Sequence, residues 1–295
     1  MHNRRAFFCV ASVLVSCVTV FVGCATGSKT GGEDKEPSGA MKITAPVALA
    51  FKGEAGRQEK MKYYSASVVE THEEGQITRR KEEAVEFTVV TRTQDVEKDH
   101  LVWEMETVEK DGAVNLHDLA FPELKESLEY KIRPNGEVLQ AGPYPRTSVF
   151  FVPPVPLPNR LVSPGDTWTL SHEWISMSSG IPLKVDLVTI FKSALKCGEG
   201  LCAVLEISGD VSISGPLQEK LRFESEIKGY LIYSIDKGSM VASRIANREA
   251  MLTGPTGMRV HSCMVGVMRE PTLTVPGLVD EMKCNPEEFS TKIVQ

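Results

Sequence analysis

The feature that most limits how this chain folds is a two-residue alternation of apolar and polar side chains over long stretches. Between residues 201 and 213, one set of alternate positions is apolar and the intervening set is mostly polar, and residues 221–235 repeat the pattern. Side chains of a β-strand point alternately to the two faces of a sheet, so each stretch predicts a strand with one buried face. Shorter stretches follow the same rule at residues 85–89, 101–105 and 128–132.

Turn sequences separate the alternating stretches. They include Glu74-Gly75, Asp111-Gly112, Asn135-Gly136 and Lys237-Gly238. Such dipeptides favour tight reversals between neighbouring strands. We therefore predict a mainly β fold in which long antiparallel strands form a curved sheet or half-barrel. Very little helix is expected, because only residues 117–127 have room for a turn or two.

Two segments share a short pattern. Residues 128–138 and 231–241 each contain L-x-Y-x-I, then a glycine turn, then Val. The pattern indicates two similar halves, but any aromatic strand before a glycine turn looks alike, so coincidence explains it equally well. If the halves are real, they form either two packed sheets or one merged sheet.

The N-terminus has the layout of an export signal. Arg4 and Arg5 precede an uncharged run over residues 6–22. This run is at the short limit of a membrane span, so a retained anchor helix is the alternative. The sequence Phe21-Val22-Gly23-Cys24 resembles the lipobox of bacterial lipoproteins, although Phe21 replaces the usual Leu. A second match ends at Cys17 but would leave an apolar stub on the mature chain, so we prefer Cys24.

The lipobox resemblance implies where the protein is located. In that family the cysteine carries several acyl chains, such as palmitate, which together hold a protein durably on a membrane. An Asp after the cysteine favours retention at the inner membrane, and Ala25 is present here instead. The resemblance therefore implies a lipid anchor at Cys24 in the outer membrane of a Gram-negative cell, facing the periplasm.

Composition changes along the chain indicate its organisation. The residues after Cys24 are rich in Gly, Ser, Lys and Glu, which is typical of a disordered tether. We expect a signal peptide at 1–23, a tether at 24–58, a first β-rich half at 59–140, a proline-rich connector at 141–165 and a second β-rich half with disulfides at 166–295.

The connector region has seven prolines between Ala141 and Trp168, which exclude a helix or a central strand. Its apolar residues Phe150, Phe151, Val152 and Leu157 either form a lid or docking strip, or pack on the sheet beneath a stiff connector, which we prefer. The sequence over residues 157–168 resembles an element of uncharacterised β-rich bacterial lipoproteins.

Four cysteines remain once the signal peptide is removed and Cys24 is acylated. In an oxidising compartment an even number predicts disulfides. Cys197 and Cys202 bracket a short turn between two alternating runs, so we expect them to be paired, and Cys263 with Cys284. A metal site is the alternative, but no C-x-x-C pair is present and only His261 is near Cys263.

Several function classes find no support. The chain has 33 basic and 39 acidic side chains, which argues against a nucleic-acid partner. Ser176-Met-Ser-Ser-Gly180 lacks the first Gly of a nucleophile elbow, and Glu224 with Glu226 falls on the polar face of a strand. No cofactor fingerprint or paired-histidine metal motif occurs. We expect neither an enzyme nor a cofactor.

Two hypotheses then describe the function. The first is a lipid or other hydrophobic ligand on a concave sheet, an arrangement similar in outline to periplasmic lipoprotein-carrier half-barrels. Its candidate contact residues are Trp103, Met105, Phe223, Leu231 and Tyr233. The alternative is a structural lipoprotein that docks an envelope protein through an exposed patch or an open edge strand.

Overall fold

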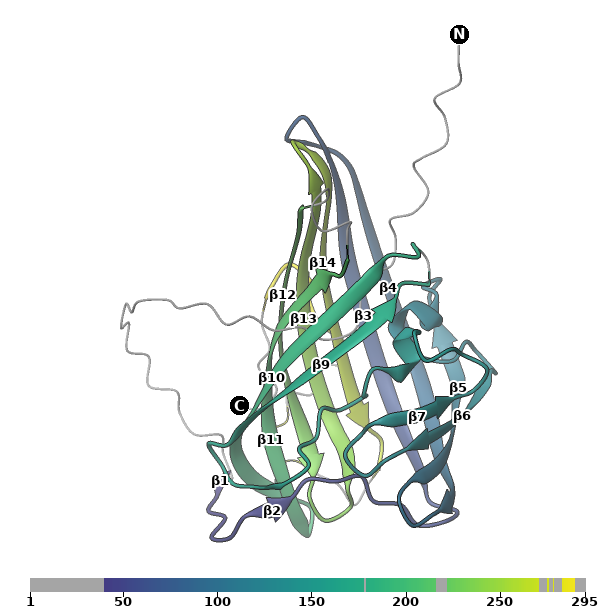
Figure 1. Ribbon diagram of the computed structural model, residues 1–295, viewed down its shortest axis with the longest axis vertical. Coiled ribbons are helices and arrows are strands. Elements are labelled where there is room, and N and C mark those ends of the chain that lie inside the picture. The colour runs from purple at the N-terminus through teal and green to yellow at the C-terminus, as the bar shows by residue number, and fades with distance from the viewer. Residues whose placement is uncertain are drawn as a thin grey trace.

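A computed structural model of the chain describes residues 40–177, 179–215, 222–270, 275, 278 and 283–289. These residues form strands almost throughout, with two short 3₁₀ helices (Figure 1). The elements in chain order are β1 (Ala40–Met41), β2 (Val47–Ala48), β3 (Gln58–Glu73), β4 (Gln76–Val96), β5 (Leu101–Asp111), η1 (Leu116–Leu119), β6 (Ser127–Ile132), β7 (Val138–Ala141), η2 (Val149–Phe151), β8 (Leu161–Val162), β9 (Thr167–Ile175), β10 (Pro182–Cys197), β11 (Gly200–Ile213), β12 (Arg222–Ser234), β13 (Ser239–Thr253) and β14 (Thr256–Met268).

One curved sheet organises the molecule. It has 12 strands in the order β1-β10-β11-β12-β13-β14-β3-β4-β5-β6-β7, with β9 beside β10. The sheet curls so that β9 and β10 lie opposite β5, β6 and β7, as Figure 1 shows, and it stays open between β9 and β7. The predicted fold class is confirmed. The strands of residues 59–140 and those of residues 166–295 belong to a single sheet, in which β14 pairs with β3.

Alternate residues of the sequence lie on opposite faces of this sheet, the apolar ones on the buried face and the polar ones on the exposed face. Along β10, Leu183, Val185 and Leu187 are buried, whereas the intervening side chains are partly exposed. Lys184 and Asp186 form an ion pair on the wet face. Because each strand presents a continuous apolar row, the concave side of the curved sheet becomes the main hydrophobic core.

The proline-rich connector crosses the open side of the half-barrel. It leaves edge strand β7 and reaches β9 at the opposite edge, so it spans the gap that the sheet leaves (Figure 1). On the way, Phe150, Val152 and Val155 are buried in the core formed by the concave face. The connector therefore packs on the sheet, as preferred above, and it also covers the interior.

Part of the segment expected to be a tether is ordered instead. Residues 24–58 are not a tether throughout, because β1 pairs with β10, β2 pairs with β8, and Leu49 is buried. Phe51 makes edge-on ring contacts with Trp103, at 5.0 Å between centroids, and with Tyr233 at 5.9 Å. The apolar sequence at residues 46–51 supplies the buried surface that the Gly- and Ser-rich part lacks.

Both expected cysteine pairs are bonded. Cys197 and Cys202 join the ends of the β10–β11 hairpin, with Cα atoms 5.6 Å apart. Cys263 on β14 is bonded to Cys284, so the described residues 283–289 are held near that strand. Cys24 and the signal peptide lie outside the described residues. No helix in the described part of the chain is long and apolar enough to cross a membrane.

Candidate ligand-binding cavity

A cavity of about 160 Å³ lies inside the half-barrel. Its walls come from the sheet, from the segment around η1 and from the proline-rich connector. Leu119, Ala120 and Phe121 represent the η1 segment, and Phe150 and Val152 the connector. Most of the wall is apolar, because alternate side chains of the strands turn inward from several sides at once.

The structure brings together three of the five residues predicted to contact a ligand. Trp103 and Met105 reach the cavity from β5, and Leu231 reaches it from β12. These strands are far apart in the sheet order. Only the curvature of the sheet makes them face the same space.

The other two predicted residues do not line this cavity. Tyr233 is fully buried, since Phe51 from the incorrectly predicted tether packs against its ring. Phe223 lies on the same face of β12 but beyond Ile227, opposite Met251 of β13. The sequence could not distinguish Phe223 and Tyr233 from Leu231, because the three side chains lie on the same face of β12.

One wall of the cavity carries polar side chains. Ser243 and Asn247 belong to β13, and Ser262 is directly opposite Asn247 on β14. All are buried, with Asn247 only 4% exposed. Asn247 Nδ2 donates a hydrogen bond of 2.6 Å to Glu249 Oε1, and Asn247 Oδ1 has no hydrogen-bond partner among the described residues.

Glu249 is a buried carboxyl beside this polar wall. Its neighbours across the strands are Ser225 on β12 and Val260 on β14. Burial raises the pKa of Glu249 to about 8, and the hydrogen bond from Asn247 opposes that rise only in part. Glu249 is therefore mostly protonated and uncharged at neutral pH.

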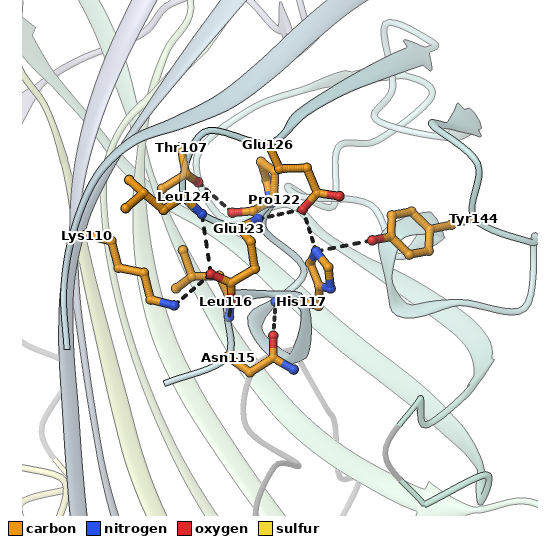
Figure 2. A network of polar contacts seen from close by, with 10 residues as sticks. All are labelled: Thr107, Lys110, Asn115, Leu116, His117, Pro122, Glu123, Leu124, Glu126 and Tyr144. Carbon is orange, nitrogen blue, oxygen red and sulfur yellow. Dashed lines mark hydrogen bonds and ion pairs between the residues drawn. The ribbon is translucent and has the colours of Figure 1, made fainter. Parts of the chain in front are cut away.

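A polar network holds the η1 segment in place. Figure 2 shows the two carboxylates at its centre, Glu123 and Glu126. Glu123 accepts hydrogen bonds from Lys110 Nζ at 2.7 Å and from the backbone N–H of Leu116 at 2.6 Å. Burial raises the pKa of Glu123, but the hydrogen bonds from Lys110 and Leu116 outweigh it, so the pKa lies below its ordinary value.

The same network joins the η1 segment to the proline-rich connector. Glu126 Oε2 is 2.5 Å from His117 Nε2, which in turn is 3.2 Å from the hydroxyl oxygen of Tyr144 (Figure 2). Tyr144 belongs to the connector, and its ring stacks on Phe150 with centroids 4.1 Å apart. His117 lies in η1 beside Leu119, and its partner Tyr144 stacks on Phe150, so it links the two segments that contribute Leu119 and Phe150 to the cavity wall. We call His117, Glu126 and Tyr144 the latch.

The other candidate chemistry in the sequence stays on the surface. Glu224 forms an ion pair with Arg222, and Glu226 with Lys228. Among the described residues, no group of three or more His, Cys, Asp or Glu side chains is placed to hold a metal ion.

Sequence reasoning missed Asn247, Glu249 and the latch. A signal existed for the first two, because both are polar residues in register with the apolar Ile245 and Met251 along one strand. The latch had no such signal, since Tyr144 is 27 residues from His117 and nothing in the sequence relates them.

No protein-family model and no curated protein sequence matches the chain. Among solved structures, it is similar to an exported protein with a YmcC-like fold from Bacteroides fragilis, at 11% identity over 76% of this chain and 100% of that one, with a TM-score of 0.30. It is also similar to DynF of the dynemicin biosynthesis pathway of Micromonospora chersina, at 8% identity over 86% and 95% of the two chains, with a TM-score of 0.21.

An outer membrane channel from Pseudomonas putida F1 is similar at 9% identity over 77% of this chain and 100% of that one, with a TM-score of 0.22. All of these TM-scores are too low to carry an argument about function.

Proposed function

We propose that this protein is a non-enzymatic lipoprotein of the bacterial envelope that binds a hydrophobic ligand inside its half-barrel. The observation that carries the proposal is the apolar cavity of about 160 Å³, which the η1 segment and the connector line on one side and which a polar latch between these two segments supports. An engineered cavity of about 150 Å³ with apolar walls stays dry and binds benzene, so a space of this size suits a small apolar group.

The alternative, docking of an envelope protein on an exposed apolar patch, has weaker support. The large hydrophobic side chains that are exposed in the described residues are distributed over several elements, for example Ile77 on β4, Leu161 on β8 and Ile175 on β9. Scattered single residues of this kind are normal on protein surfaces.

A titration tests the cavity. The mature chain from residue 24 would be exported behind an ordinary signal peptide with Cys24→Ser, which leaves it without acyl chains. Met105, Met240 and Met264 line the cavity, whereas Met61 and Met251 do not, so ¹³C-methyl methionine signals report on it directly. We expect toluene to shift the first three signals and leave the other two in place.

Val138→Phe should abolish these shifts, because Val138 lines the cavity and the added ring fills it. Val102→Phe is the matched control, since Val102 adjoins Trp103 but points to the opposite face of β5. If toluene moves none of the cavity methionines in folded protein, ligand binding is not the function.

Location is tested separately. The full chain should sediment with membranes after a high-salt wash, and Cys24→Ala should release it, because the acyl chains supply the attachment. A Cys24→Ala protein that still fractionates with membranes would show that the attachment does not depend on acyl chains at Cys24, as a retained anchor helix over residues 6–22 would produce.

A further inference from the structure

The cavity wall contains one polar atom whose hydrogen bonding the apolar ligand proposed above does not explain. Asn247 is almost completely buried in its wall, yet Asn247 Oδ1 has no donor among the described residues. Leaving a buried acceptor unpaired is unfavourable, and native proteins do so rarely. An apolar residue at this position would have avoided the loss.

The neighbours of Asn247 do not supply the missing donor. Its own amide nitrogen already donates to Glu249, so the oxygen is the end left over. Asn247 lines the cavity and Glu249 does not, so the side chain that carries the unpaired oxygen is part of the cavity wall. A molecule in the cavity is therefore well placed to provide the hydrogen bond.

The cavity also selects against charge. No Lys, Arg, His, Asp or Glu side chain is among the described residues that line it. A carboxylate, phosphate or ammonium group would lose its hydration and find no counter-ion there, which is strongly unfavourable. A neutral group with one donor, by contrast, satisfies Asn247 at little cost.

We propose that the ligand is a neutral amphiphile with a short aliphatic or aromatic body and a hydroxyl group that donates to Asn247 Oδ1. This inference rests on the proposed function and adds the class of ligand. The hydroxyl end lies against Asn247 and Ser262, and the apolar body extends toward Trp103 and Phe150.

The test compares four small molecules on the unacylated mature chain, with the same methionine signals as readout. They are 1-hexanol, its isomer methyl pentyl ether, which accepts but cannot donate, hexanoate and toluene. We expect 1-hexanol to bind about five- to tenfold more tightly than the ether, the typical effect of one hydrogen bond. Hexanoate at pH 7.5 should bind at least tenfold more weakly than 1-hexanol.

Two variants test whether Asn247 is the source of the tighter binding of 1-hexanol. Asn247→Leu should remove the advantage of 1-hexanol over the ether while toluene still binds. Ser212→Ala, on the polar face of β11, is the control and should leave the advantage intact. The comparison in wild type stands even if Asn247→Leu fails to fold.

The outcomes are distinguishable. If toluene binds and the alcohol and ether bind equally, the donor assignment is wrong and the hydrophobic cavity stands. If hexanoate binds as well as 1-hexanol, the neutral-ligand assignment is wrong. If none of the four binds folded protein, the proposed function fails together with this inference.

Discussion

Glu249 shows how a single buried residue couples the stability of the fold to pH. Its carboxyl is buried opposite Ser225 and Val260, neither of which can carry charge, and its pKa is raised to about 8. In the unfolded chain the same carboxyl ionises near its usual pKa of 4.5. Between these two values the folded protein binds more protons than the unfolded chain.

The sign of the effect follows from this difference. Because the folded state holds the proton, the contribution of Glu249 to the free energy of unfolding decreases as pH rises from about 4.5 to about 8, and then levels off. We expect Glu249→Gln, which stays neutral, to remove this decrease. Its stability relative to wild type should rise by up to a few kcal/mol across that range.

Urea unfolding at pH 5, 6, 7 and 8 measures the change. Only the difference between wild type and Glu249→Gln matters, since other groups titrate equally in both. Parallel stability profiles would show that Glu249 ionises normally in the folded protein.

His117 is the second residue whose role can be isolated. It touches Glu126 and Tyr144 and is the link between the η1 segment and the connector. Its side chain is 27% exposed, so water weakens these contacts. We expect His117→Ala to lower the free energy of unfolding by about 1 kcal/mol, a typical value for a hydrogen bond.

Hydrogen exchange is the more specific readout. Backbone amides at residues 116–121 should exchange faster in His117→Ala, because the latch no longer restrains them. Arg133→Ala breaks the exposed ion pair with Glu137 and should leave these amides unchanged. Unaltered exchange at 116–121 in His117→Ala would mean that η1 is held by packing alone.

At the level of elements, the two disulfides make different contributions. Cys197 and Cys202 are separated by 5 residues and Cys263 and Cys284 by 21. A bond that closes a longer loop restricts the unfolded chain more. Replacing both cysteines of a pair by Ser should therefore cost about 2 kcal/mol for the hairpin bond and about 3 kcal/mol for the longer loop.

Thermal unfolding of the two double variants checks this order. The hairpin variant should melt higher than the Cys263→Ser/Cys284→Ser variant. The reverse order would show that native contacts, rather than loop closure, determine what each bond contributes.

The elements also show how far sequence reasoning reaches. Alternation along residues 201–213 predicted β11, because a strand has a period of two whatever it packs against. The packing of Leu49 and Phe51 was missed, because the run at residues 46–51 is too short to identify a strand by its alternation and the ring partners of Phe51, Trp103 and Tyr233, are distant in sequence.

For the molecule as a whole, curvature creates the site. Trp103 and Leu231 were predicted to share one ligand, yet only the curl of the sheet brings β5 and β12 to the same cavity. The connector then closes the open side from one edge strand to the other. The sequence pattern predicts faces of strands, but the depth of the space between them depends on twist and on what fills it.

If the protein works as proposed, its interior holds a small hydrophobic molecule in the cell. Native mass spectrometry of the unacylated mature chain, exported to the periplasm and purified without detergent, would detect that molecule. We expect a neutral adduct of one molecule per chain that is absent from Val138→Phe and present in Val102→Phe. A wild-type chain that carries no adduct, and gains none when hydrophobic molecules are offered, would show that the cavity does not bind a ligand.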